Sequence, residues 1–188
     1  MDTGLLIWQY LQIGFTHVLP LGFDHLLFIL TLFFMPAGFR SIVIACSVFT
    51  LAHSLSLALA SSGLVLPQAS IIEPLIACSI IVSALGNILS KGDGKWRYPL
   101  VGCFGLIHGL GFASALRDAG LPSKGFITAL ISFNVGVEIA QISVLLIAYV
   151  LITIPFGAKT WYKTRLAYPS CAIIASVGMY WLIQRTVA

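Results

Sequence analysis

Long apolar runs alternate with short clusters of Pro, Gly and charged residues along the whole chain. A helix needs about 20 residues to cross the hydrocarbon core of a bilayer, and most of the runs are close to that length. They predict about six transmembrane helices. The predicted spans cover residues 21–37, 41–61, 68–90, 98–117, 125–154 and 166–185. The pattern thus indicates an all-α fold, a polytopic membrane helix bundle.

A shorter apolar stretch, residues 4–16, comes before the first predicted span. It is too short to cross a membrane alone, and Pro20 would break or kink a helix that continued through it. We therefore expect a short N-terminal interfacial or re-entrant segment. Trp8 and Tyr10 suit the depth of a membrane interface, where amphipathic aromatic side chains are enriched.

The composition agrees with a membrane protein and excludes several other classes. Hydrophobic residues make up 59% of the 188 residues and charged residues 9%, with a mean hydropathy of +1.02. A soluble domain has about a quarter charged residues. The spans leave no room for a soluble catalytic domain, and the chain has neither a P-loop nor a dinucleotide-binding glycine motif. We expect one transmembrane helical domain over residues 1–188, in contact with the lipid bilayer and with no nucleic-acid partner.

The distribution of the 10 Lys and Arg residues predicts an orientation. Seven of them follow the first, third and fifth predicted spans, and three follow the others. Positive residues concentrate in cytoplasmic loops. The count predicts that loops 90–97 and 157–165 are cytoplasmic and that both termini lie outside.

Ionisable side chains also occur inside the apolar spans or at their edges, where charge is costly. They are His17, Asp24, His25, His53, Glu73, His108 and Glu138, which include all four histidines of the chain. A carboxylate in hydrocarbon costs several kcal/mol unless it is paired, hydrated or bound to a cation. So many such groups in one small bundle indicate a functional site.

The first three of these residues surround a helix break. Pro20 and Gly22 lie between His17 and the pair Asp24 and His25, so we expect the helix to open there. Freed backbone carbonyls can then face a cavity, which is how membrane proteins build cation sites.

The next two histidines lie in different spans. His53 has hydroxyl side chains nearby that could accept its second N–H, as happens around ligating imidazoles. His108 follows the spacing Gly105-x-x-x-Gly109, which lets another helix approach its backbone closely. That approach would bring a ligand of the second helix within reach of His108.

The two remaining carboxylates have alternative interpretations. Glu138 shares a helical face with Asn134 and Gln141, which favours either a metal ligand or a structural hydrogen bond between helices. Glu73 lies near the start of the third span. Its charge costs little free energy if this position is at the membrane interface. The polar residues that continue at a spacing of four are Ser79, Ser83 and Asn87. Packing is the simpler interpretation of this stripe, as it is for any single histidine.

Imidazole and carboxylate ligands without thiolate suit borderline divalent metals such as Ni, Zn, Co or Fe(II). The four cysteines are widely spaced within apolar runs and form no Cys-x-x-Cys pair, so we interpret them as packing residues. The expected ligand is a divalent metal ion, as transported substrate or as bound ion.

These motifs together resemble the HupE/UreJ family of small integral membrane proteins, which are regarded as nickel or cobalt permeases. The resemblance runs from about Trp8 to Gln141 and includes His-x6-Asp-His, Thr-Leu-Ala-His-Ser, His-Gly and Asn-x-Gly-x-Glu in that order. It implies a bacterial inner-membrane protein and a divergent second branch of the family, because His108 and Glu138 lie on successive spans. By resemblance, the first metal-handling motif is His17, Asp24 and His25, and the second is His108, Gly109 and Glu138. His53 and Glu73 match less firmly.

Two functions of different classes follow. The first is a membrane permease for a divalent transition-metal cation, Ni²⁺ before others, with an intramembrane site of His, Asp and Glu. The alternative is an intramembrane metal-dependent enzyme in which histidines hold Zn or Fe and Asp24 or Glu138 is the general base. A haem-binding subunit ranks third. The glycine spacing also permits helix packing between copies, and the oligomeric state stays open.

Overall fold

Helices make up nearly all of the structure, a computed structural model that describes residues 2–89, 97–118 and 125–187, with 113–118 described by backbone only. The helices are α1 (Thr3–Val18), α2 (Phe23–Phe33), α3 (Phe39–Ser61), α4 (Ala69–Leu89), α5 (Arg97–Asp118), α6 (Phe126–Ala148), the π-helix η1 (Tyr149–Thr153), α7 (Ile154–Phe156), the π-helix η2 (Tyr162–Ala167) and α8 (Tyr168–Val187). No β-strand occurs in these described ranges. The all-α prediction is confirmed.

Four helical segments are long and apolar enough to cross a membrane: Phe39–Ser61, Ala69–Leu89, Phe126–Phe156 and Tyr162–Val187. The pair α1 and α2 meets the same test only when taken together, as a broken span or a re-entrant loop bent by 70°. Exposed side chains such as Leu51, Ile131 and Ile173 give these helices an apolar outer surface. The protein is therefore a membrane protein with a helix bundle.

Two of the six predicted spans, 21–37 and 98–117, are not among these candidates in the described residues, although helix α5 covers the second. The first differs more. Helix α2 has 11 residues, which is about 16 Å of helix and only half of a membrane. Helix α1 ends at Val18, before Pro20, and α2 starts only after Gly22. The stretch predicted to be interfacial or re-entrant is thus the first half of a broken pair.

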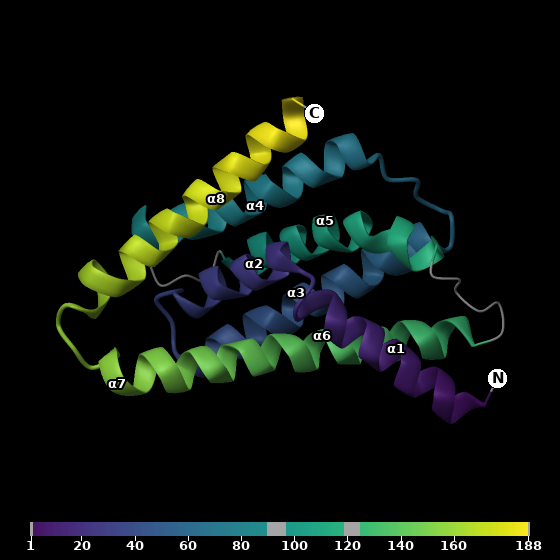
Figure 1. The fold of residues 1–188 in the computed structure, drawn as a ribbon, viewed down its shortest axis with the longest axis horizontal. Helices are drawn as coiled ribbons and strands as arrows, with labels where there is room; N and C mark the ends of the chain where they lie inside the picture. Colours follow the sequence, from purple (N-terminus) through teal and green to yellow (C-terminus); the bar gives the residue numbers. More distant parts are fainter. Residues whose placement is uncertain (1, 90–96, 119–124, 188) are drawn as a thin grey trace.

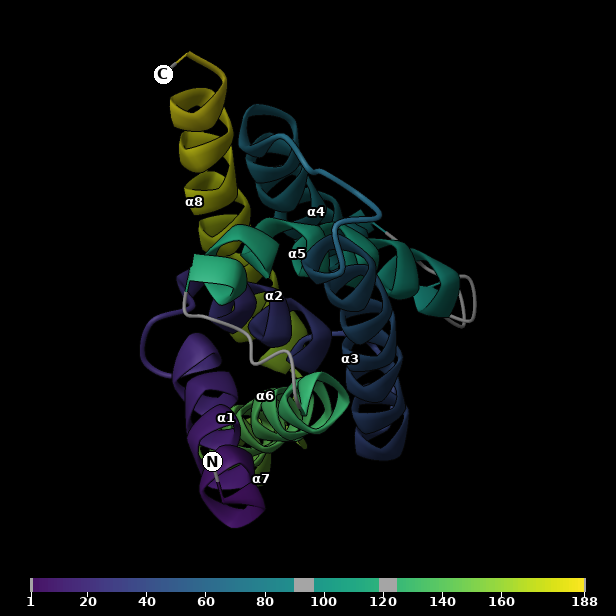
Figure 2. The same cartoon turned by 90° about the vertical axis from the view of Figure 1, so that its right-hand side faces the viewer.

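Three helix pairs form the outside of the bundle, and α2 lies between them. The closest pairs are α3 with α5, α1 with α6, and α4 with α8. In Figures 1 and 2 the short helix α2 sits at the centre of these pairs. It contacts α1, α3, α4, α6 and α8. This position explains why α2 is apolar on nearly all sides, since a helix surrounded by others has no face for water.

The two ends of the bundle differ in charge. Helices α2 and α4 finish, and α3, α5 and η2 begin, at the end shown on the left in Figure 1, which we call the basic end. The cations described there are Arg40, Arg97, Lys159, Lys163 and Arg165. In Figure 1 the N-terminus lies at the opposite end and the C-terminus lies at the top.

Candidate metal site

The break between α1 and α2 brings two histidines together. His17 lies in the last turn of α1 and His25 in the first turn of α2. Their ring centroids are 4.5 Å apart, with one ring edge-on to the other. The bend requires Gly22, because a Cβ there would lie 2.2 Å from the carbonyl oxygen of His17.

The pair α3 and α5 supplies the other two histidines. A Cβ on Gly109 would lie 2.2 Å from the carbonyl oxygen of His53, so the glycine lets the two backbones approach closely. His53 and His108 are 0% and 1% exposed, which leaves them no contact with bulk water. The GxxxG spacing thus packs α5 on α3 within this chain and carries both imidazoles toward α2.

Three of the imidazoles form a group that could hold a metal ion. His17, His25 and His53 each offer a ring nitrogen, and these nitrogens lie within 4.8 Å of one another. A divalent ion bound to imidazole lies about 2 Å from each nitrogen, so two nitrogens on one ion are at most about 4 Å apart. Small rotations of the side chains would close the group, which we call the three-His group, around an ion.

Four of the six ring nitrogens in this group lack a hydrogen bond to any described residue. Within the described part of the chain, Nε2 of His17, Nε2 of His25 and both ring nitrogens of His53 are buried without a hydrogen bond. Buried polar atoms are normally paired, and an unpaired one costs about 1–3 kcal/mol. A bound cation would satisfy one lone pair on each ring, so the donor set fits a borderline divalent metal.

His108 is the fourth imidazole, with its ring centroid 5.1 Å from that of His25. Its Nε2 lies 3.0 Å from Oγ of Ser79. The hydroxyl of Ser79 donates its proton to the carbonyl oxygen of Ile76, so Oγ accepts from Nε2–H of His108. The lone pair of a neutral His108 is then on Nδ1, which is buried without a partner among the described residues. Fixing one ring nitrogen in this way prepares the other as a ligand.

Aromatic rings enclose the imidazoles. The Phe112 ring lies 3.8 Å from the His17 ring, and Phe49 lies within 6.0 Å of the His25 and His53 rings and 5.1 Å from the His108 ring, all measured between centroids. Phe133 stacks on His53. Such a shell keeps water from the ring nitrogens and strengthens their electrostatic interaction with a cation.

Asp24 lies beside the three-His group but is held by an arginine. Both of its carboxylate oxygens accept from Nη2 of Arg185 at 3.1 Å. Arg185 also donates to the carbonyl oxygen of Glu73 and lies over the Trp181 ring. Sequence reasoning missed Arg185 by treating it as an orientation charge, although its position at the end of an apolar span was the available signal.

A cavity of about 470 Å³ leads from this ion pair to the histidines. Its lining includes Asp24, Arg185 and Glu73 together with His17, His25 and His108. The Glu73 side chain is exposed. The cavity therefore joins the buried imidazoles to a mouth that carries two carboxylates and one guanidinium.

Glu138 occupies a different place. Its Oε1 accepts a hydrogen bond from Ser47 Oγ at 2.7 Å, and its neighbour on the same helical face, Gln141, accepts from Thr50 at 2.9 Å. Glu138 lines a separate groove between α3 and α6, also with Thr50 and Asn134. Among the described residues, the group that could hold a metal contains no carboxylate. The metal-binding roles predicted for Asp24, Glu73 and Glu138 stay predictions.

A comparison with known protein families identifies the family of this chain. The model of the family described as HupE / UreJ protein matches residues 2–185, nearly the whole chain. The chain belongs to the HupE/UreJ family. No curated protein and no solved structure matches it significantly. The match confirms the resemblance found in the motifs and extends it beyond Gln141 through α8.

HupE/UreJ proteins are generally associated with nickel and cobalt transport. The family and the histidine group therefore both suggest that this membrane protein handles a metal ion. The fold divides each of the two motifs that the resemblance implied. The first gives two imidazoles to the three-His group and one carboxylate to the ion pair with Arg185. The second gives His108 to the cavity and Glu138 to the groove on α6.

Proposed function

We propose that this HupE/UreJ protein is a permease for a divalent transition-metal cation, Ni²⁺ before Co²⁺, which binds at the three-His group during transport. The observation that carries the proposal is the set of buried ring nitrogens without partners at a helix break in the centre of the bundle. Broken helices line the substrate sites of membrane transporters, because freed backbone groups are tolerated only where they face a cavity.

The cation enters from the 470 Å³ cavity. Asp24 and Glu73 attract it at the mouth, and it exchanges water for imidazole nitrogens as it reaches His17 and His25. By the distribution of Lys and Arg, the basic end is cytoplasmic and the cavity faces outside. We place the protein in the inner membrane of a bacterium on the same argument and on its family.

The membrane potential is sufficient to drive accumulation. Two positive charges that cross about 100 mV, inside negative, release about 4.6 kcal/mol. This free energy corresponds to an accumulation of about a thousandfold. No nucleotide is needed, in agreement with the absence of a P-loop from the sequence.

The test is uptake of radioactive Ni²⁺ into vesicles that contain the purified protein. His25→Ala should abolish uptake, because it removes one ligand. It should leave the protein inserted and monodisperse in detergent, because the space it vacates borders the existing metal cavity. Gln12→Ala, an exposed position on α1, is the control and should keep full uptake. Unchanged uptake in His25→Ala would overturn the proposal.

The metalloenzyme is the second candidate, because three histidines with an open fourth position are also a catalytic zinc arrangement. Metal analysis after purification without chelators separates the two. About one equivalent of Zn or Fe that survives dialysis against a weak chelator favours the enzyme. Reversible Ni²⁺ binding that His25→Ala removes favours the permease.

A further inference from the structure

Beyond the histidines, polar side chains continue through the bundle to a second cavity. We propose that this track along α4 is the route by which the cation leaves the three-His group, and that Arg97 closes its far end. The inference rests on the proposed permease function. The track consists of the polar stripe noted in the sequence: Ser79, Ser83 and Asn87.

The track begins at the histidines. Ser79, which is buried, bonds His108 at the floor of the metal cavity. One turn further along α4, Ser83 Oγ lies 2.6 Å from Thr31 Oγ1 on α2. Thr31 donates its own proton to the carbonyl oxygen of Phe28, so Ser83 donates to Thr31. Oxygen atoms that could contact a passing cation thus lie on two facing helices.

Asn87, the next member, carries the track toward the basic end. Its amide nitrogen donates to the carbonyl oxygen of Thr31 at 2.7 Å. Its amide oxygen accepts from the guanidinium of Arg97, which also donates to the carbonyl oxygen of Gly86 at 2.7 Å. A cavity of about 20 Å³, room for about one water, lies among Thr31, Ser83, Asn87 and Arg97.

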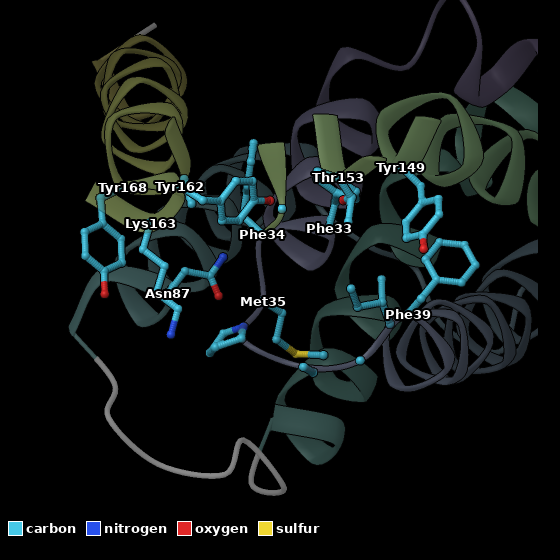
Figure 3. Close-up of a pocket in the computed structure, with 16 residues that line it drawn as sticks. Phe33, Phe34, Met35, Phe39, Asn87, Tyr149, Thr153, Tyr162, Lys163 and Tyr168 are labelled. Carbon is cyan, nitrogen blue, oxygen red and sulfur yellow. The ribbon is translucent and has the colours of Figure 1, made fainter. Parts of the chain in front are cut away.

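A large cavity lies beyond Asn87. It measures about 760 Å³ and opens at the basic end. Figure 3 shows Asn87 at one side of this cavity and Phe39 and Tyr149 at the other. Asn87 and Met35 line both this cavity and the water-sized one, so these two side chains form the boundary between the track and the basic end.

Arg97 is suited to close this boundary. It is 6% exposed, and a charged side chain buried among the helices of a membrane protein is a candidate functional group. Its fixed positive charge repels a divalent cation held among Ser83 and Thr31. The contact between Arg97 and Asn87 has to break before the cation reaches the large cavity, which prevents a continuous leak.

The experiment measures Ni²⁺ binding in detergent and Ni²⁺ flux in vesicles on the same variants. Ser83→Val replaces a hydroxyl of the track with two methyl groups. It should lower uptake at least about tenfold, the effect of about 1.4 kcal/mol, with Ni²⁺ affinity unchanged. Ser143→Val is the matched control, because that hydroxyl bonds only its own helix at an exposed position of α6. It should leave both quantities unchanged.

Two further variants test the closure. Arg97→Gln keeps a donor for Asn87 and removes the charge, so efflux from preloaded vesicles should become about tenfold faster. Arg97→Lys keeps the charge and should restore slow efflux, a difference that a purely structural role would not produce. Retained Ni²⁺ affinity in each variant reports an intact three-His group.

The outcomes separate the two proposals. If the unmodified protein neither binds nor transports Ni²⁺, the permease function itself fails. If it transports Ni²⁺ and Ser83→Val retains full uptake, the cation uses another route and the track is wrong. If Arg97→Gln and Arg97→Lys show the same efflux, the charge of Arg97 does not close the route.

Discussion

At the scale of single residues, the site depends on which nitrogen of each imidazole is free. Ser79 fixes this for His108 by accepting from Nε2, while the rings of His17, His25 and His53 keep unpaired nitrogens toward one another. The side chains of Phe49, Phe112 and Phe133 surround these imidazoles. On the proposed function, we expect the hydrogen bond from His108 to contribute to metal affinity.

We predict that Ser79→Ala weakens Ni²⁺ binding about tenfold, the usual effect of removing the partner of a ligating or neighbouring histidine. The His108 ring loses its fixed orientation, while the protein stays folded because only one buried hydroxyl is removed. Isothermal titration in detergent measures the change. The control is Ser176→Ala on α8, whose hydroxyl bonds its own helix at an exposed position. Equal affinity in Ser79→Ala and the unmodified protein would contradict the role given to Ser79.

For the ion pair of Asp24 and Arg185 we predict a substitution that strengthens Ni²⁺ binding. Arg185→Gln removes a positive charge from the mouth of the metal cavity and leaves Asp24 free to attract cations. We expect Ni²⁺ to bind about threefold to tenfold more tightly, with the larger effect at low ionic strength because salt screens the exposed part of the interaction. Arg185→Lys, which keeps the charge, should bind as the unmodified protein does. Weaker binding in Arg185→Gln would mean that the arginine positions the site instead of opposing the cation.

At the scale of elements, two backbone features bring the histidines together. They are the break between α1 and α2 and the close contact of α3 with α5. The first places His17 against His25, and the second places His53 near His108. Helix formation alone does not produce either contact. Each needs a glycine, because a Cβ at Gly22 or Gly109 would overlap a carbonyl oxygen of the neighbouring segment.

Gly109→Ala should therefore destabilise the protein by about 1–3 kcal/mol, the range found when extra atoms are forced into a packed interior. It should also lower Ni²⁺ affinity, because α5 has to move away from His53. Gly102→Ala lies on the same helix, and its Cβ would meet a Val48 methyl group at an ordinary 3.6 Å. It is the matched control and should change stability little. Thermal unfolding in detergent compares the two variants.

Much of the element level could be predicted from the sequence. The apolar runs locate α3 to α6 and α8 within a few residues, and Pro20 locates the end of α1. The partners of the carboxylates could not be predicted. Motif order suggests one site for Asp24 and Glu138, but hydropathy does not say which helices pack side by side. Packing of α8 on α4 brings Arg185 to Asp24, and packing of α6 on α3 gives Glu138 a hydroxyl partner.

At the scale of the whole molecule, the two ends of the bundle have different tasks in the proposed transport. The metal cavity opens at one end, and the cavity of about 760 Å³ opens at the basic end. If the basic end is cytoplasmic, an inside-negative potential drives the cation from the first cavity to the second. The potential then has a measurable effect on the rate and the extent of uptake.

We predict that a potassium diffusion potential of about 100 mV, inside negative, raises Ni²⁺ accumulation by up to about a thousandfold over vesicles without a potential. Valinomycin and a potassium gradient set the potential, and radioactive Ni²⁺ measures uptake in vesicles with the basic end inside. Reversing the gradient should prevent accumulation. Ni²⁺ uptake that does not depend on the potential would indicate electroneutral exchange, for example with protons.

Helix α2 has a mechanical property that its short length and central position impose. It carries His25 in its first turn and Thr31 less than two turns later, on one rod of 11 residues. Since the rod is rigid on this scale, a tilt or rotation that pulls His25 away from its neighbours also displaces Thr31 from Ser83 and Asn87. On the proposed function, release of the cation by His25 and rearrangement of the track at Thr31 would thus be a single rigid-body movement of α2.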